Sequence, residues 1–170
     1  KFAWDDEYLI INNPYVKSWS FLPNIFTNHL YKGSEMDSNF YRPLQSVSFI
    51  IDYSIWRLNP FGYHLTSLLL HIFNSALVYL IVITISSSAL IAFLTALMFG
   101  ISPVISGVTY YIPARADLLM ALFVFLSILC FVRYIEKDKK IFYIISIVSF
   151  ALSLLCKEMA VMLPLLLLLT

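Results

Sequence analysis

The sequence contains little charge, few cysteines and few glycines, and each scarcity argues against a class of protein. Only 12% of the 170 residues are charged, well below the roughly 25% of soluble domains. The net charge is +1 and no basic tract is present, so we expect no nucleic acid partner. The two cysteines, Cys130 and Cys156, lie inside apolar runs, which argues against a disulfide framework. The four glycines are scattered and form no phosphate-binding loop.

Apolar residues, in contrast, make up 61% of the chain. They concentrate in long runs, and a helix that crosses the hydrocarbon core of a bilayer needs about 20 of them. The sequence therefore predicts an all-α polytopic membrane protein. The predicted spans cover residues 65–85, 89–105, 118–135 and 141–156, and a fifth opens at Met159.

The basic residues predict how these spans are oriented. The connection after the third span is rich in Lys and Arg, and such loops stay in the cytoplasm. Its basic residues are Arg133, Lys137, Lys139 and Lys140. Alternating the spans then puts residues 1–63, residues 103–117 and the Lys157-Glu158 pair on the extracytoplasmic or lumenal side. That side faces outward from the inner membrane of a prokaryote, or into the endoplasmic reticulum of a eukaryote.

Residues 1–63 are too apolar for a soluble domain. Apolar side chains between Val16 and Leu30 recur at helical spacing, which indicates a helix lying in the headgroup zone. A second helix is predicted from Pro43 to about Leu58, since proline suits the first helical position. Charged residues argue against full insertion of that stretch: Arg42, Asp52 and Arg57. We therefore predict one large extracytoplasmic loop carrying two juxtamembrane helices, with residues 64–170 as the membrane part.

The ends of the sequence suggest a fragment of a longer chain. It starts at Lys1 without a signal peptide and stops inside a leucine run. We therefore expect that at least one span precedes it and that further segments follow it.

Most ionisable residues outside the cytoplasmic loop fall on the extracytoplasmic side. Charge is costly near hydrocarbon, so ionisable groups at a membrane boundary are candidates for function. The candidates are Asp5, Asp6, Arg42, His64, Arg115, Asp117, Lys157 and Glu158. Together they suggest a polar reaction chamber on a helical membrane base.

The acids and Arg115 each have a functional and a structural interpretation. The Asp5-Asp6 pair suits general-base chemistry, but an acidic cap on a helix end is equally consistent with the sequence. Arg115 could bind a phosphate or carboxylate bidentately. Alternatively, Arg115 forms a surface pair with Asp117. For Asp117, capping a helix that starts at Leu118 is the favoured interpretation.

The histidines and Asn74 are weighed in the same way. His71 and Asn74 share a face of one span with His64, and such polar groups usually hydrogen-bond neighbouring helices. We favour this structural role for His71 and Asn74, and a place on an amphipathic surface for His29. His64 lies at the boundary and is the better functional candidate. No histidine pair has the spacing of a zinc-protease helix.

Several short motifs occur in the order found in one known family. They are Trp4-Asp5-Asp6, Tyr41-Arg42-Pro43-Leu44, Asn59-Pro60-Phe61-Gly62-Tyr63-His64-Leu65, Leu70-His71, Ala114-Arg115-Ala116-Asp117-Leu118 and Lys157-Glu158. Over nearly its whole length the chain resembles the N-terminal membrane part of the transmembrane and tetratricopeptide-repeat-containing family. That family belongs to the GT-C superfamily of polyprenyl-phosphate-sugar glycosyltransferases, and its eukaryotic members are O-mannosyltransferases. Similar proteins usually have His-Pro where this chain has Ser102-Pro103, so we assign no role to that turn.

The resemblance implies a GT-C-like helical bundle that transfers a sugar from a polyprenyl-phosphate donor to an acceptor hydroxyl. Asp5 and Asp6 match the acidic pair of the first outer loop, and one of them would be the base. The implied ligands of the donor phosphate are Arg115 and Lys157, then Arg42 and His64, with Asp117 and Glu158 in support. The acceptor would be a protein or a lipid-linked molecule, and membrane lipids surround the bundle. We assign no cofactor or metal ligand, while a divalent metal bridging acids and phosphate is an open alternative.

Two other classes compete with this interpretation. A transporter or flippase for a lipid-linked or small anionic substrate also uses intramembrane His, Lys and Glu. Transporters more often bind near the bilayer midplane, whereas the acids here cluster at the surface. A purely structural subunit would leave Asp5, Asp6 and Arg115 dispensable.

Overall fold

The structure is a computed structural model, and it describes residue 2, residues 4–34 and residues 39–162. The described residues fold into helices with no strand among them, which confirms the all-α prediction. The α-helices are α1 Leu22–Thr27, α2 Pro43–Trp56, α3 Pro60–Ser86, α4 Ala89–Ile101, α5 Pro103–Tyr110, α6 Arg115–Lys137 and α7 Lys140–Leu154. The shorter helical turns are η1 Glu7–Ile11, η2 Pro14–Val16, η3 Trp19–Phe21, η4 Ile112–Ala114 and η5 Glu158–Met162.

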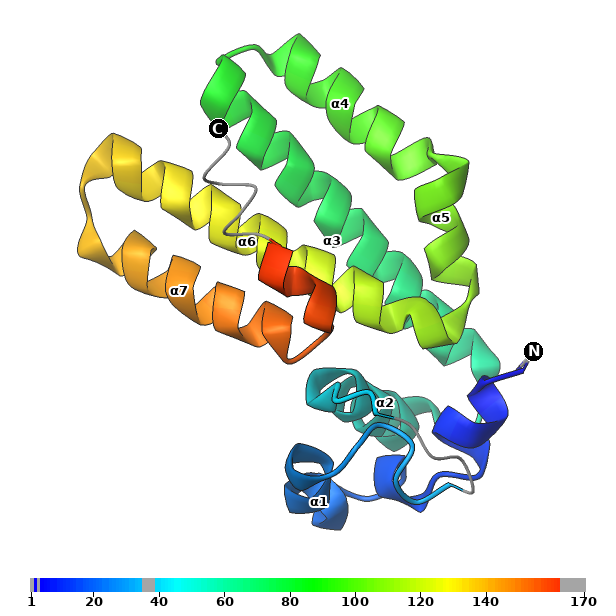
Figure 1. Ribbon diagram of the computed structural model, residues 1–170. Helices are drawn as coiled ribbons and strands as arrows, with labels where there is room; N and C mark the ends of the chain where they lie inside the picture. The colour runs from blue at the N-terminus through cyan, green and yellow to red at the C-terminus, as the bar shows by residue number, and fades with distance from the viewer. Residues whose placement is uncertain (1, 3, 35–38, 163–170) are drawn as a thin grey trace.

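The centre of the bundle is the contact between α3 and α6 (Figure 1). Helices α4 and α5 pack against α3, and α7 packs against α6. Helix α3 has 27 residues, and η4 with α6 forms a continuous 26-residue helical stretch. Both are long and apolar enough to cross a membrane, as predicted for residues 65–85 and 118–135.

The predicted span over residues 89–105 is wrong as one straight helix, because the chain breaks at Ser102 into α4 and α5 (Figure 1). Pro103 is the cause, since proline disfavours helical geometry in the residue before it. Ser102 accordingly takes an extended ψ of 123°. Proline suits the first position of a new helix, so α5 begins there and leads the chain toward η4.

The last two predicted spans do not appear as full-length helices within the described residues. Helix α7 covers most of the predicted stretch 141–156 with 15 residues, shorter than the roughly 20 residues needed to cross the hydrocarbon core without tilt. The fifth span, expected from Met159, begins as the 3₁₀ turn η5. Its remainder lies outside the described residues.

Residues 4–34 and 39–59, here called the N-terminal layer, cover one end of the bundle (Figure 1). The single helix predicted between Val16 and Leu30 is wrong, because the chain forms η2, η3 and α1 instead. Ser18 has an extended backbone, and its hydroxyl accepts a hydrogen bond from the Ser20 amide at 3.3 Å. Serine in that conformation starts a new helical turn rather than continuing one.

The second predicted helix is confirmed as α2, which ends at Trp56, two residues before Leu58. Beyond it, the Asn59 side chain accepts from the Phe61 amide at 3.2 Å and caps α3. The buried apolar core of the layer joins η1, η2 and α2 to the bundle. Its members include Leu9, Ile10, Val16, Phe49 and Ile50, with Tyr63 from α3 and Ile112 from η4.

Polar residues on the spans connect neighbouring helices, as predicted for His71 and Asn74. His71 Nε2 lies 3.0 Å from the carbonyl oxygen of Gly100 in α4. The Asn74 side-chain amide donates to the carbonyl of Leu118 in α6 at 3.0 Å. Ser127 and Ser146 join α6 to α7 by exchanging hydroxyl-to-carbonyl hydrogen bonds of 3.0 and 2.9 Å. These contacts fix the helix packing that supports the N-terminal layer.

The sidedness inferred from the basic loop can be tested by cysteine labelling. In a full-length protein with Cys130 and Cys156 replaced, a cysteine at Lys32 should react with an impermeant thiol reagent on the extracytoplasmic or lumenal side. Asp138 follows α6, and the connection from α6 to α7 lies far from the N-terminal layer (Figure 1). A cysteine at this position should react only from the cytoplasm. Labelling of both positions from the same side would contradict the topology.

Candidate functional site

A cavity of about 240 Å³ opens where the N-terminal layer meets the bundle. The residues that line it come from Asp5 and η1, from the turn at Leu30 and Tyr31, from the start of α2, from the connection between α5 and the first turn of α6, and from Lys157 before η5. The polar and charged side chains that line it include Asp5, Tyr31, Arg42, Tyr111, Asp117 and Lys157. The structure thus gathers four of the sequence-predicted site residues around one cavity.

The structure distinguishes the two acids that the sequence could not rank. Asp5 lines the cavity, and the Tyr111 hydroxyl donates to its Oδ2 at 2.5 Å. Asp6 is 3% exposed and is not among the residues that line this cavity. A base must reach the proton that it removes, so Asp5 is the better placed of the two.

Two ion pairs stand at the edge of the same cavity. Arg42 holds Glu158 through a bidentate contact, with Nη2–Oε1 at 2.7 Å and Nε–Oε2 at 3.2 Å. The Lys157 Nζ donates to Asp117 Oδ1 at 2.5 Å. The hydrogen bond from Arg42 lowers the pKa of the Glu158 carboxyl. The two pairs anchor Lys157 and the start of η5 against the starts of α6 and α2.

These contacts correct the sequence-based interpretations of Asp117. It does not pair with Arg115, since its carboxylate holds Lys157. It does not cap a helix starting at Leu118 either, because α6 already begins at Arg115. Asp117 lies in the first turn of α6, where a negative charge favourably faces the positive end of the helix dipole.

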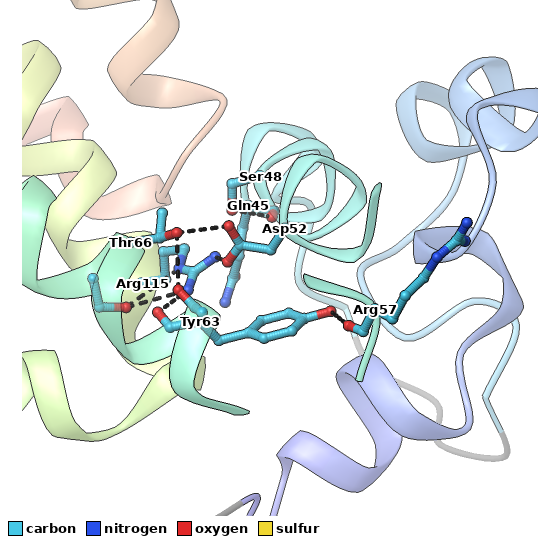
Figure 2. A network of polar contacts seen from close by, with 9 residues as sticks. Gln45, Ser48, Asp52, Arg57, Tyr63, Thr66 and Arg115 are labelled. Carbon is cyan, nitrogen blue, oxygen red and sulfur yellow. Dashed lines mark hydrogen bonds and ion pairs between the residues drawn. The ribbon is translucent and has the colours of Figure 1, made fainter. Parts of the chain in front are cut away.

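Arg115 lies away from the cavity, in a buried network at the junction of α2, α3 and α6 (Figure 2). Its guanidinium pairs with Asp52 of α2, and both side chains are almost fully buried. It also donates to the Tyr63 carbonyl at 2.6 Å and to the Ser67 hydroxyl at 3.3 and 3.4 Å. The Thr66 hydroxyl donates to the other Asp52 oxygen at 2.7 Å. Arg115 therefore has its hydrogen-bonding groups engaged by other residues of the protein, and it does not line the cavity.

The remaining candidate, His64, also lies outside the cavity lining. Its ring stacks on Tyr110, with the centroids 5.9 Å apart. Within the described residues, no group of three or more His, Cys, Asp or Glu side chains could hold a metal ion.

Sequence reasoning missed three residues that shape the site. Asp52 was interpreted only as a barrier to insertion, although an acid in an apolar helix calls for a buried partner. Gln45 donates to the Pro113 carbonyl at 2.7 Å and ties α2 to the segment that starts α6. Tyr111 had no signal in the sequence, because its contact with Asp5 spans 106 positions.

Fold and site together define a helical membrane protein with two acids and two cations around one cavity at the end of its bundle. The chain belongs to the dolichyl-phosphate-mannose-protein mannosyltransferase family, whose family model matches residues 50–170.

Named relatives agree with the family match. The chain is 32% identical to protein O-mannosyl-transferase TMTC1 of Homo sapiens over 81% of its length, and 29% identical to protein O-mannosyl-transferase Tmtc1 of Drosophila melanogaster over 94%. It spans only 16% and 19%, respectively, of those two proteins. No solved structure matches the chain significantly.

The buried ion pair predicts a large effect of one small substitution. Asp52→Asn keeps the side-chain size but leaves the Arg115 charge buried without a counterion, which should cost about 3–5 kcal/mol of unfolding free energy. Asp138→Asn is the matched control, since Asp138 is exposed and asparagine tolerates its left-handed backbone. Denaturant unfolding of the full-length protein in detergent measures the unfolding free energy of each variant. Equal stability of the two variants would contradict a structural role for the pair.

Proposed function

We propose that this chain forms part of the active site of a membrane protein O-mannosyltransferase. This part would contain the general base and the cations that bind the donor phosphate. The enzyme would move mannose from a polyprenyl-phosphate donor to a hydroxyl of a protein acceptor on the extracytoplasmic or lumenal side. The family match supports mannosyl transfer. The observation that carries the proposal is the cavity that Asp5 shares with Arg42 and Lys157.

Asp5 acts as the general base in this proposal. Its carboxylate takes the proton of the acceptor hydroxyl while the hydroxyl oxygen forms a bond to the anomeric carbon of the sugar. The bond from that carbon to the donor phosphate oxygen breaks, and its electron pair stays on the phosphate. Asp5 is favoured over Asp6 because it faces the cavity where both substrates would meet.

Arg42 and Lys157 act on the leaving phosphate. Negative charge grows on that phosphate as the bond breaks, so fixed cations stabilise the transition state more than the ground state. Both cations line the cavity and are held in place by acids, Arg42 by Glu158 and Lys157 by Asp117. The supporting acids keep the cations oriented before the donor arrives, so less ordering is needed when it binds.

Arg115 and His64 take other places in this proposal. Arg115 supports the site indirectly, because its pair with Asp52 holds α2 against the start of α6. His64 stays outside the reacting centre and packs against Tyr110.

Replacing the base tests the proposal directly. Asp5→Asn should lower kcat by about 10² to 10⁴, the usual range for losing general-base catalysis, while donor binding is retained. The assay is transfer of labelled mannose from dolichyl-phosphate mannose to a serine/threonine peptide by the purified full-length protein. Glu7→Gln is the control, since Glu7 is an exposed acid of η1 that does not line the cavity. Turnover of Asp5→Asn equal to that of the control would refute the role of Asp5.

The cations predict a graded result in the same assay. Lys157→Ala and Arg42→Ala should each lower kcat by about 10² to 10³, as when one stabilising donor is removed. Arg42→Lys should fall in between, because lysine keeps the charge but loses the planar fork. Lys140→Ala serves as the control, since this exposed lysine starts α7 at the other end of the bundle. Near-normal turnover in both alanine variants would contradict the proposal that the donor phosphate binds in this cavity.

A further inference from the structure

Tyr111 contacts the proposed base directly. It follows α5 and precedes η4, with φ and ψ of −97° and 103°. That extended backbone lies between the two helical segments, and the side chain lines the cavity. Its hydroxyl donates to Asp5 Oδ2 at 2.5 Å, so the connection between α5 and α6 is tied directly to the N-terminal layer.

The two oxygens of Asp5 are in different situations. Oδ2 accepts the Tyr111 hydrogen bond, whereas within the described residues Oδ1 has no hydrogen-bond partner. A short hydrogen bond to one oxygen fixes the rotation of the carboxylate. The other oxygen is then the one left to receive a proton.

Several charged and titratable groups surround this contact. From the N-terminal layer they are Tyr31, Arg42 and the buried Asp6, and from the opposite side they are Asp117 and Lys157. Burial, followed by the hydrogen bond to Asp5 and its charge, raises the pKa of Tyr111. The phenol therefore stays protonated and remains a donor across the pH range in which an enzyme is assayed.

We infer that Tyr111 is a positioning residue of the transfer reaction, which holds Asp5 Oδ2 so that Oδ1 takes the proton of the acceptor hydroxyl. This inference rests on the proposed function. The proton moves from the acceptor oxygen to Oδ1, and the Tyr111 hydroxyl keeps its own proton throughout. The hydrogen bond from the Tyr111 hydroxyl also stabilises the negative charge of the Asp5 carboxylate beside its acidic neighbours.

The pH dependence of turnover distinguishes this role from simple packing. In Tyr111→Phe the carboxylate loses its donor and protonates more readily, so the acidic limb of the kcat profile should move up by about one pH unit. Above that limb kcat should fall about tenfold, because the carboxylate is no longer held in one orientation. The KM for dolichyl-phosphate mannose should stay within about twofold, since Tyr111 is not assigned to the phosphate.

Tyr110→Phe is the matched control. Tyr110 is the neighbouring tyrosine, is 84% exposed and is not part of the cavity lining. Removing its hydroxyl should leave unchanged both the acidic limb of the kcat profile and the value of kcat above that limb. An unshifted limb in Tyr111→Phe, or an equal shift in Tyr110→Phe, would overturn the inference.

A second variant covers the case in which Tyr111→Phe does not fold. Incorporating 3-fluorotyrosine at position 111 keeps the shape and makes the hydroxyl a stronger donor, so the acidic limb should move to lower pH. An unchanged limb in that variant overturns the inference. If Asp5→Asn abolishes transfer while neither Tyr111 variant moves the limb, only the role of Tyr111 fails. If Asp5→Asn retains normal transfer, the proposed function fails and the inference fails with it.

Discussion

The buried pair of Arg115 and Asp52 is the constraint on which the rest of this structure depends. It brings together α2 from the N-terminal layer and α6 from the bundle, with α3 supplying Tyr63, Thr66 and Ser67 (Figure 2). Two charges removed from water are tolerated only when they are paired and fully hydrogen-bonded. The pair therefore favours one arrangement of the three helices, and it is satisfied only when α2 lies across the start of α6.

The cavity is a consequence of that arrangement. Once α2 is fixed, Arg42 at its start meets Glu158, and Gln45 meets the Pro113 carbonyl. The start of α6 in turn places Asp117 against Lys157. Helix α5, which follows the break at Ser102, ends next to Tyr111 and so places it beside Asp5. The acid and the cations thus come from distant parts of the sequence, and the buried network, rather than any local motif, sets where they stand.

The apolar runs predicted the helices well, because a bilayer imposes a length and a composition that are visible residue by residue. The breaks were visible too, in Pro103 and in Ser18, but the long apolar pattern outweighed these short signals. Pairings were harder to predict. Arg115 lies two residues before Asp117, so the sequence suggested a local pair, whereas the structure pairs each of them with a residue that is 40 or more positions away. The motif resemblance pointed to Asp5 and Lys157 as candidates, and both line the cavity, yet only the packing of the layer on the bundle separates Asp5 from Asp6 and reveals Tyr111.

A structure of the full-length protein with a non-transferable polyprenyl-phosphonate mannose would test the account most directly. It should show the phosphonate oxygens within hydrogen-bonding distance of Arg42 and Lys157, and the anomeric carbon on the Asp5 side of the cavity. The Arg115 guanidinium should remain paired with Asp52 in that complex. A phosphonate bound elsewhere in the bundle, with the Asp5 cavity empty, would contradict the account.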